Sequence, residues 1–71
     1  MIYKSTAVII KEGRWFVAKS LELGVASQGK TIPEATANLR EAVELYLENS
    51  PRERKFLSTI VPLVTSFEVY A

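Results

Sequence analysis

A single long helix-forming segment constrains the fold of this chain more than any other feature. The segment begins with a capping box, in which Thr31 is the expected N-cap and Glu34 is placed to reach back to the Thr31 amide. It extends to about Asn49, and its apolar residues fall within an arc of about 140°. This buried stripe comprises Ile32, Ala35, Leu39, Ala42, Val43, Tyr46 and Leu47. One such helix covers one face of one small sheet.

The segments on either side of this helix are typical of strands. Residues 2–11 and 14–21 are rich in β-branched and aromatic types and predict a hairpin with its break at Glu12-Gly13. Val25–Gln28 predicts a brief third strand, and Leu63–Tyr70 predicts the last one. We therefore expect a single domain over residues 1–71, of the α+β class. Its order is β-β-β-α-β, with a small, mainly antiparallel sheet and one long helix on one face.

Side chains alternate between the two faces of a strand, so the hairpin has two apolar faces. Ala7, Ile9, Phe16 and Ala18 line one face, and Val8, Ile10, Trp15 and Val17 line the other. Because one helix covers only one of them, the second leaves an apolar patch of the kind that marks an interaction surface. The alternative is that the last strand and the connector before it fold over this second face.

Composition argues against most catalytic chemistry. The 71 residues contain no cysteine, histidine or aspartate, so all eight carboxylates belong to glutamates. This removes the commonest general base, the usual zinc ligands and the aspartates that typically hold magnesium, and we expect no enzyme, metal or cofactor. A net charge of +1 gives no electrostatic reason to expect nucleic acid. No apolar run approaches the roughly 18 residues needed to span a bilayer, so we expect a cytoplasmic protein.

One motif points the other way, because Gly24-x-x-x-x-Gly29-Lys30-Thr31 matches the P-loop pattern letter for letter. A P-loop, however, lies between a buried parallel strand and a helix, and its magnesium usually needs an additional aspartate. Here the preceding strand belongs to a hairpin and no aspartate exists. We therefore interpret Lys30 as a surface turn residue and Thr31 as a helix cap.

The central 27 residues, Glu22–Glu48, resemble the core signature of the HicB family of antitoxins. The matching elements are Gly24, Ser27-Gln28-Gly29, Thr31, Glu34-Ala35, Asn38-Leu39 and Glu41-Ala42, and Trp15-Phe16-Val17-Ala18 matches the second strand of that family. Lys30 departs from the pattern, because the family usually has aspartate there. With the first and last strands included, the resemblance covers essentially the whole chain.

The resemblance implies a partial RNase H-like fold without nuclease residues. It also implies a non-enzymatic role, in which the protein masks the surface of a small, mRNA-cleaving HicA-type toxin. Many HicB proteins add a C-terminal DNA-binding domain, for which this chain leaves no room, so we do not expect direct DNA binding. We expect a homodimer or higher oligomer. The alternative function is a homo-oligomeric scaffold or regulatory domain without a toxin.

Four residues are the expected partner contacts: Trp15 and Val17 on the uncovered face, with Glu22 and Gln28 beside it. Each has an ordinary structural alternative, with Trp15 in a dimer core and the two polar residues facing solvent. A second alternative places the contact on the acidic side of the helix, which would meet a basic toxin through charge complementarity. That side carries Glu41, Glu44 and Glu48.

Overall fold

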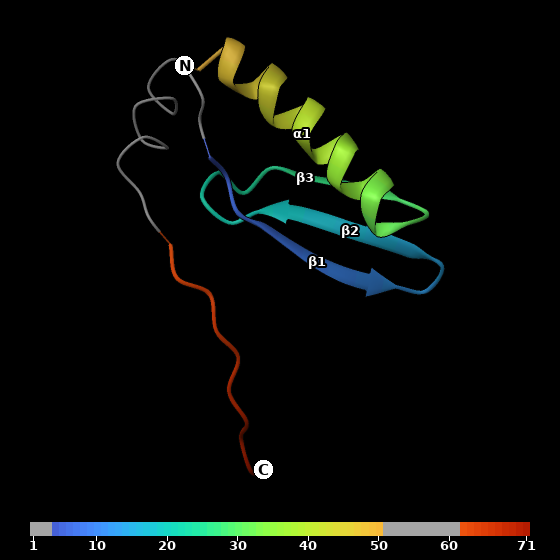
Figure 1. Cartoon of the computed structure of the whole chain (residues 1–71), viewed down its shortest axis with the longest axis vertical. Coiled ribbons are helices and arrows are strands. Elements are labelled where there is room, and N and C mark those ends of the chain that lie inside the picture. Colours follow the sequence, from blue (N-terminus) through green and yellow to red (C-terminus); the bar gives the residue numbers. More distant parts are fainter. Residues whose placement is uncertain (1–3, 51–61) are drawn as a thin grey trace.

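The protein forms a small antiparallel sheet with one helix packed obliquely across it (Figure 1). The computed structural model describes residues 4–50 and 62–71. The three strands lie in the order β1-β2-β3, so the α+β class and the antiparallel sheet with one helix are confirmed. The elements are β1 (Ala7–Glu12), β2 (Trp15–Ser20), β3 (Ala26–Gly29) and α1 (Ile32–Glu48).

The β1–β2 hairpin turns one residue later than the sequence predicts. Glu12 pairs with Trp15, so the two loop residues are Gly13 and Arg14. Gly13 has a φ of 60°, and Arg14 has a negative φ. A positive φ at the first loop residue alone is the signature of a type II′ turn, which matches the twist of the strands and favours glycine at that place.

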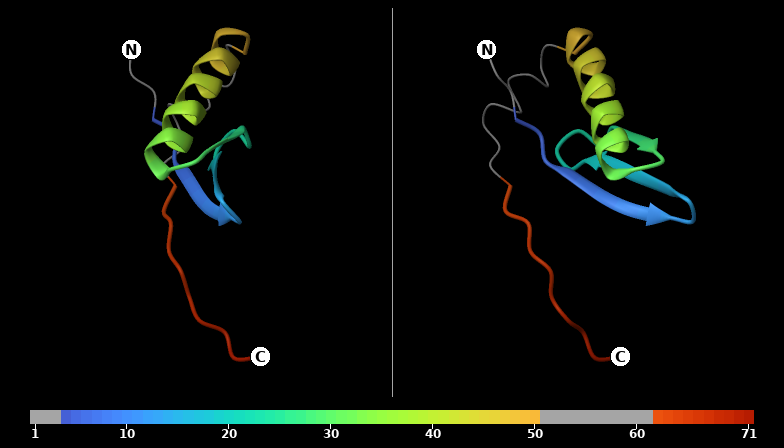
Figure 2. Two further views of the ribbon diagram at one scale, coloured as in Figure 1. Left: turned by 90° about the vertical axis from the view of Figure 1, so that its right-hand side faces the viewer. Right: turned by 45° about the vertical axis from the view of Figure 1, so that its right-hand side comes forward.

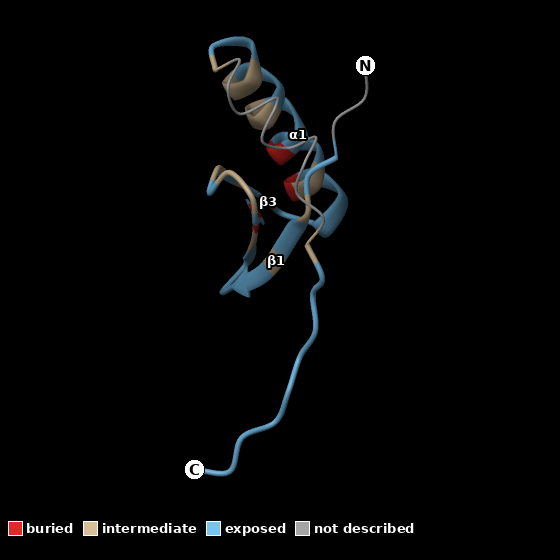
Figure 3. Ribbon diagram, turned by 90° about the vertical axis from the view of Figure 1, so that its left-hand side faces the viewer, coloured by how far each residue is buried: buried red, intermediate tan, exposed pale blue. Residues whose placement is uncertain are grey.

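The strand register assigns the side chains to the two faces as predicted. Ile9 lies opposite Ala18 on the face that α1 covers, and Ile10 lies opposite Val17 on the other face. The buried core is small and sits between β2, β3 and the first half of α1 (Figure 3). It comprises Ala18, Ala35 and Leu39, with Ile9, Phe16, Val25 and Val43 packed around them.

The start of α1 follows the expected capping chemistry in part. The Glu34 amide donates a hydrogen bond of 3.1 Å to Thr31 Oγ1, which satisfies one of the free donors of the first turn. The reciprocal bond from the Thr31 amide to the Glu34 carboxylate is not formed between these two described residues. The helix therefore begins on half of the predicted capping box, with Pro33 in its first turn as expected.

The buried stripe of α1 is shorter than predicted. Ile32, at the first position of α1, is 49% exposed. Tyr46 and Leu47 are only half-buried. A helix of 17 residues is about 25 Å long, whereas the four residues of β3 span about 13 Å. The second half of α1 therefore extends beyond the strand beneath it.

The predicted last strand, Leu63–Tyr70, is wrong for this structure. Residues 62–71 form neither strand nor helix and extend away from the sheet, as two views in Figure 2 agree. Leu63 is 95% exposed, Phe67 84% and Tyr70 100%. The sequence has the composition of a strand, but composition does not provide a neighbouring strand, and without one an extended segment forms no ladder.

Candidate functional site

The face of the sheet that points away from α1 exposes a group of large apolar side chains. We call this surface the open face and define it by Val8, Ile10, Trp15 and Val17. Ile10 is 54% exposed, and Trp15 and Val8 are also exposed, while Val17 is half-buried. These residues come from two paired strands, so their side chains form one continuous patch and not scattered single residues.

Three of the four predicted contact residues lie on this open side of the sheet. Val17 is directly opposite Gln28 of β3, and Trp15 is two residues along β2 on the same face. Gln28 is exposed and gives the patch a polar border. Residues 62–71 do not cover this face in the structure, as Figures 1 and 2 show, so the part of the alternative that places the last strand over it is not observed. The connector in that alternative lies outside the described residues.

Glu22, the fourth predicted contact, lies elsewhere and has a structural role. It follows the end of β2 that is farther from Trp15, and its carboxylate accepts hydrogen bonds from the Thr6 amide at 2.8 Å and the Ser5 hydroxyl at 3.1 Å. Desolvation of this partly buried group acts to raise its pKa, but the hydrogen bonds outweigh it and hold the pKa of Glu22 below its ordinary value. Glu22 thus ties the approach to β1 to the loop after β2.

The same corner contains the one fully buried polar side chain among the described residues, Ser20. Its hydroxyl shares a 2.7 Å hydrogen bond with the Ser5 hydroxyl and accepts one of 3.3 Å from the Leu23 amide. The Ser20 carbonyl accepts a bond of 2.9 Å from the Gly24 amide. Buried polar groups that are satisfied in this way stabilise local geometry and do not indicate a reactive site.

The P-loop letters do not form a phosphate-binding loop. Residues 26–29 lie in strand β3, which is antiparallel to β2, and Thr31 Oγ1 is occupied as the helix cap. Gly29 is required for another reason: a Cβ at this position would lie only 2.5 Å from the backbone nitrogen of Ala35. The glycine therefore permits close packing of β3 against the first turns of α1.

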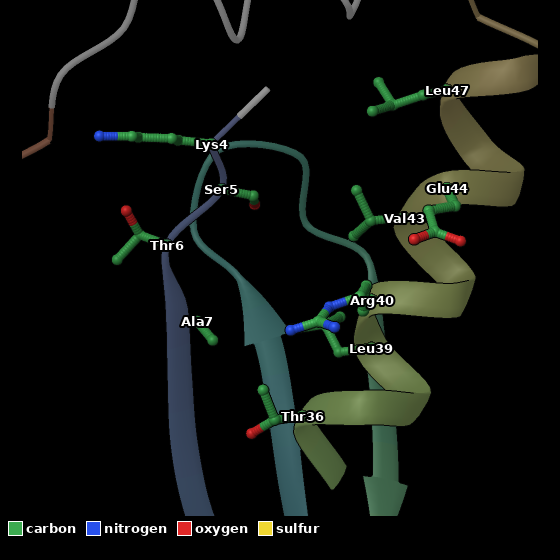
Figure 4. Close-up of a pocket in the computed structure, with 10 residues that line it drawn as sticks. All are labelled: Lys4, Ser5, Thr6, Ala7, Thr36, Leu39, Arg40, Val43, Glu44 and Leu47. Carbon is green, nitrogen blue, oxygen red and sulfur yellow. The ribbon is translucent and has the colours of Figure 1, made fainter. Parts of the chain in front are cut away.

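A second surface feature, not predicted from the sequence, is an open groove of about 670 Å³ between the start of β1 and one side of α1 (Figure 4). The groove exists because α1 packs over β2 and β3 and leaves β1 largely uncovered. Its helical residues recur at spacings of three and four, which indicates one helix side, but no sequence signal shows which strand that side adjoins. The lining residues are Lys4, Ser5, Thr6, Ala7, Thr36, Leu39, Arg40, Val43, Glu44 and Leu47.

A family model with the description "Family of unknown function (DUF7387)" matches residues 4–55, which is 52 of the 71 residues. The chain belongs to this family. The matched region of DUF7387 includes the whole sheet, α1, the open face and the groove. No curated protein and no solved structure matches the chain. The DUF7387 description names no activity, so the likeness to HicB antitoxins stays a prediction.

Two further features of this DUF7387 chain concern metal ligands and membrane-spanning helices. Within residues 4–50 and 62–71, no three side chains of the histidine, cysteine, aspartate or glutamate types gather where they would hold a metal ion. Over the same residues, no helix has the length and apolar character needed to cross a membrane.

Proposed function

We propose that this chain is a non-enzymatic protein-binding module that docks a protein partner on its open face. The observation that carries the proposal is the exposure of Val8, Ile10 and Trp15, with half-buried Val17 beside them, on one side of a two-stranded hairpin. Patches of this kind are costly to leave in water and usually mark surfaces where proteins associate. Tryptophan is also a typical energetic anchor of an interface, and Trp15 provides one at the hairpin end of the open face.

The partner we propose is a small HicA-type ribonuclease toxin, which the module would neutralise by covering its surface. The support is the resemblance of Glu22–Glu48 to the HicB signature, together with the lack of histidine, cysteine and aspartate in the chain. Polar residues border the apolar centre, with Glu12 opposite Trp15, Lys19 opposite Val8 and Gln28 opposite Val17. This arrangement of an apolar centre and a polar border is usual in protein interfaces.

Co-expression with the product of an adjacent small open reading frame tests the proposal. We expect the two proteins to purify as one complex and the module to suppress RNA cleavage by its partner. An adjacent product that neither binds nor is inhibited would remove the antitoxin role. Binding without any effect on RNA cleavage would keep the module and reject the toxin as its partner.

A matched pair of variants locates the contact. Ile10 on the open face is 54% exposed and Leu45 on the outer side of α1 is 61% exposed, so a lysine at either place removes a similar apolar surface. We expect Ile10→Lys to weaken the complex at least about tenfold, which is the effect of a hot-spot loss of about 1.4 kcal/mol. Leu45→Lys should leave affinity unchanged. The reverse result would move the docking surface to the helix.

A further inference from the structure

Within residues 4–50 and 62–71, the edge of the sheet at β1 has backbone groups with no strand beside them. The Leu21 amide donates to the Thr6 carbonyl at 2.8 Å, so the opposed pair Thr6 and Leu21 is a hydrogen-bonded pair. In an antiparallel ladder such pairs alternate, and the register then directs the amides and carbonyls of Ala7, Ile9 and Lys11 outward. An edge of this kind is a template for pairing with another strand.

The opposite edge, at β3, is different because α1 closes it in part. The Asn38 side chain donates a hydrogen bond of 2.8 Å to the Gln28 carbonyl, which is one of the outward-facing groups of β3. At β1 the helix stands away from the sheet and the groove of about 670 Å³ lies between them. A strand added to β1 would direct every second side chain into this groove, where Leu39, Val43 and Leu47 provide apolar contacts (Figure 4).

The chain itself contains a segment suited to that place. Along residues 63–70 the odd positions are Leu63, Thr65, Phe67 and Val69, and the even positions are Val64, Ser66, Glu68 and Tyr70. The odd side is the more apolar one, which is the alternation of a half-buried strand. Its large apolar side chains are between 64% and 100% exposed. The segment thus has the sequence of a strand but pairs with no strand among the described residues.

We propose that residues 62–71 of a second copy add to β1 as a fourth strand, and that two chains exchange this segment reciprocally. The odd-numbered side chains then fill the groove beneath α1, and the even-numbered ones extend the open face. A second copy is favoured over the same chain because the segment leads away from its own sheet in every view (Figures 1 and 2). Reciprocal exchange also closes a two-fold dimer and leaves no free β1 edge.

The exchange would stabilise a chain that is small for independent folding. Domains near this size bury only about 60% of their unfolded surface and gain from association. The inference concerns the β1 edge and the groove, and it does not depend on whether the open face binds a toxin. Its tests use oligomeric state, and the tests of the proposed function use partner binding, so either can fail alone.

The first test replaces residues in the segment 62–71, called the tail from here on, and measures the molar mass of the full chain by light scattering. It compares odd-numbered positions with an even-numbered one. We expect the unmodified chain to be a dimer. Phe67→Glu and Val69→Glu place a carboxylate in the groove and should raise the dimer dissociation constant at least tenfold. Ser66→Glu carries the same charge on the open side and should leave the dimer intact. The proposal is overturned if the unmodified chain is a monomer, or if Ser66→Glu weakens the dimer as much as Phe67→Glu and Val69→Glu do.

The second test blocks the β1 edge without touching the β1–β2 ladder. Lys11→Pro removes an outward-facing amide, and proline is tolerated in an edge strand where the amide faces away from its neighbour. Lys11→Ala is the matched control, since both variants lose the Lys11 side chain, whose Nζ lies 5.9 Å from the centroid of the Phe16 ring. We expect only Lys11→Pro to become monomeric while its circular dichroism retains the helix. A Lys11→Pro dimer overturns the proposal.

Mixing the Lys11→Pro and Phe67→Glu variants tests whether the tail pairs with β1 of a second chain or with β1 of its own chain. Lys11→Pro keeps an intact tail, and Phe67→Glu keeps an intact edge, so a mixed pair can make one of the two exchanges while neither variant alone can make any. We expect the mixture to contain dimer that neither variant forms by itself. A mixture that stays monomeric indicates that the tail serves its own chain or another protein, and it overturns the exchange.

Discussion

The β3 side and the β1 side of the sheet differ sharply, although the same three-stranded sheet and the same helix make both. At β3 the helix backbone approaches so closely that Gly29 has no room for a Cβ, and Asn38 bonds to the edge of the strand. At β1 the helix leaves a groove, and Ala7 is exposed although it lies on the helix-covered face. One helix packs tightly on two strands and leaves the third available.

The difference shows which side of the sheet is closed by its own helix and which side stays accessible in the described residues. Close packing on the β3 side uses small residues, with Ala18 and Ala35 fully buried and Leu39 nearly so. The β1 side offers backbone groups, a groove and the adjoining open face. The following variants test this contrast, beginning with the largest expected effect.

Enlarging one small side chain on each side gives the sharpest contrast. Gly29→Ala places a Cβ against the Ala35 backbone, which must shift, and we expect a loss of about 3 kcal/mol in the free energy of unfolding. Ala7→Val adds more volume on the open β1 side and should cost less than about 0.5 kcal/mol. Urea unfolding of both variants measures this. Equal costs would show that the two sides are packed alike.

Gly24→Asn is a useful control for the glycine effect itself. Gly24 has a φ of 73° and nothing within 4 Å of an added Cβ, and asparagine tolerates such a backbone better than other residues. The substitution should therefore cost far less than Gly29→Ala. A comparable loss would mean that the sheet responds to any glycine replacement and not to crowding at α1.

Leu39→Ala tests the point where the two sides meet. Leu39 is 5% exposed in the core and also lines the groove. Truncation of a buried leucine costs about 2–5 kcal/mol, and we expect about 2.5 because the groove already lies beside the site. Leu45→Ala on the outer side of α1 should cost less than about 0.5 kcal/mol. Thermal unfolding that fails to separate the two variants would contradict the assigned core.

Asn38→Ala tests the closure of the β3 edge. The variant removes the hydrogen bond of 2.8 Å to the Gln28 carbonyl, and we expect a loss of about 1 kcal/mol, as is typical of one hydrogen bond. Amide hydrogen exchange should quicken in β3 and stay unchanged in β1. Thr36→Ala is the control, because the Thr36 hydroxyl bonds only within the helix, to the Ile32 carbonyl. Faster exchange in β1 would show that Asn38 acts on the whole sheet.

Glu22→Gln should have the smallest effect, and its sign depends on pH. The folded pKa of Glu22 lies below its ordinary value of 4.5, so its carboxylate contributes stability above that value. This contribution is lost as the pH falls through the lower folded pKa. Stability of the unmodified chain should therefore decline more steeply than that of Glu22→Gln as the pH falls below 4.5. Identical slopes for the two proteins would show that the bonds to Ser5 and Thr6 do not matter.

Much of the local structure could be predicted from residue patterns. The start of the helix at Thr31 follows from its capping residue, and its C-cap Asn49 lies two residues before Pro51. The two faces of the hairpin follow from alternation, which the register of Ile9 and Ile10 confirms. The turn at Gly13 was predicted one residue early, because a strand pattern does not specify which pair closes the hairpin.

The candidate site was predictable only where it depends on that alternation. Trp15, Val17 and Gln28 lie on one side of the sheet, because Trp15 is two residues from Val17 on β2 and Gln28 is directly opposite Val17 on β3. Glu22 is different, since a loop carboxylate can face a partner or accept bonds from its own chain, and only the folded chain brings Ser5 and Thr6 to it. The role of Gly29 likewise requires the position of Ala35.

The sequence by itself determined which chemically reactive residue types are present, where the helix and its cap lie, and which residues of each hairpin strand share an apolar face. These features depend on residue types and short spacings. Only the tertiary structure decided that α1 lies over β2 and β3, that β1 keeps a free edge beside a groove, and that residues 62–71 leave their own sheet. These are contacts between segments far apart in the chain. Their geometry depends on how closely one helix can pack against a glycine, which no local pattern specifies.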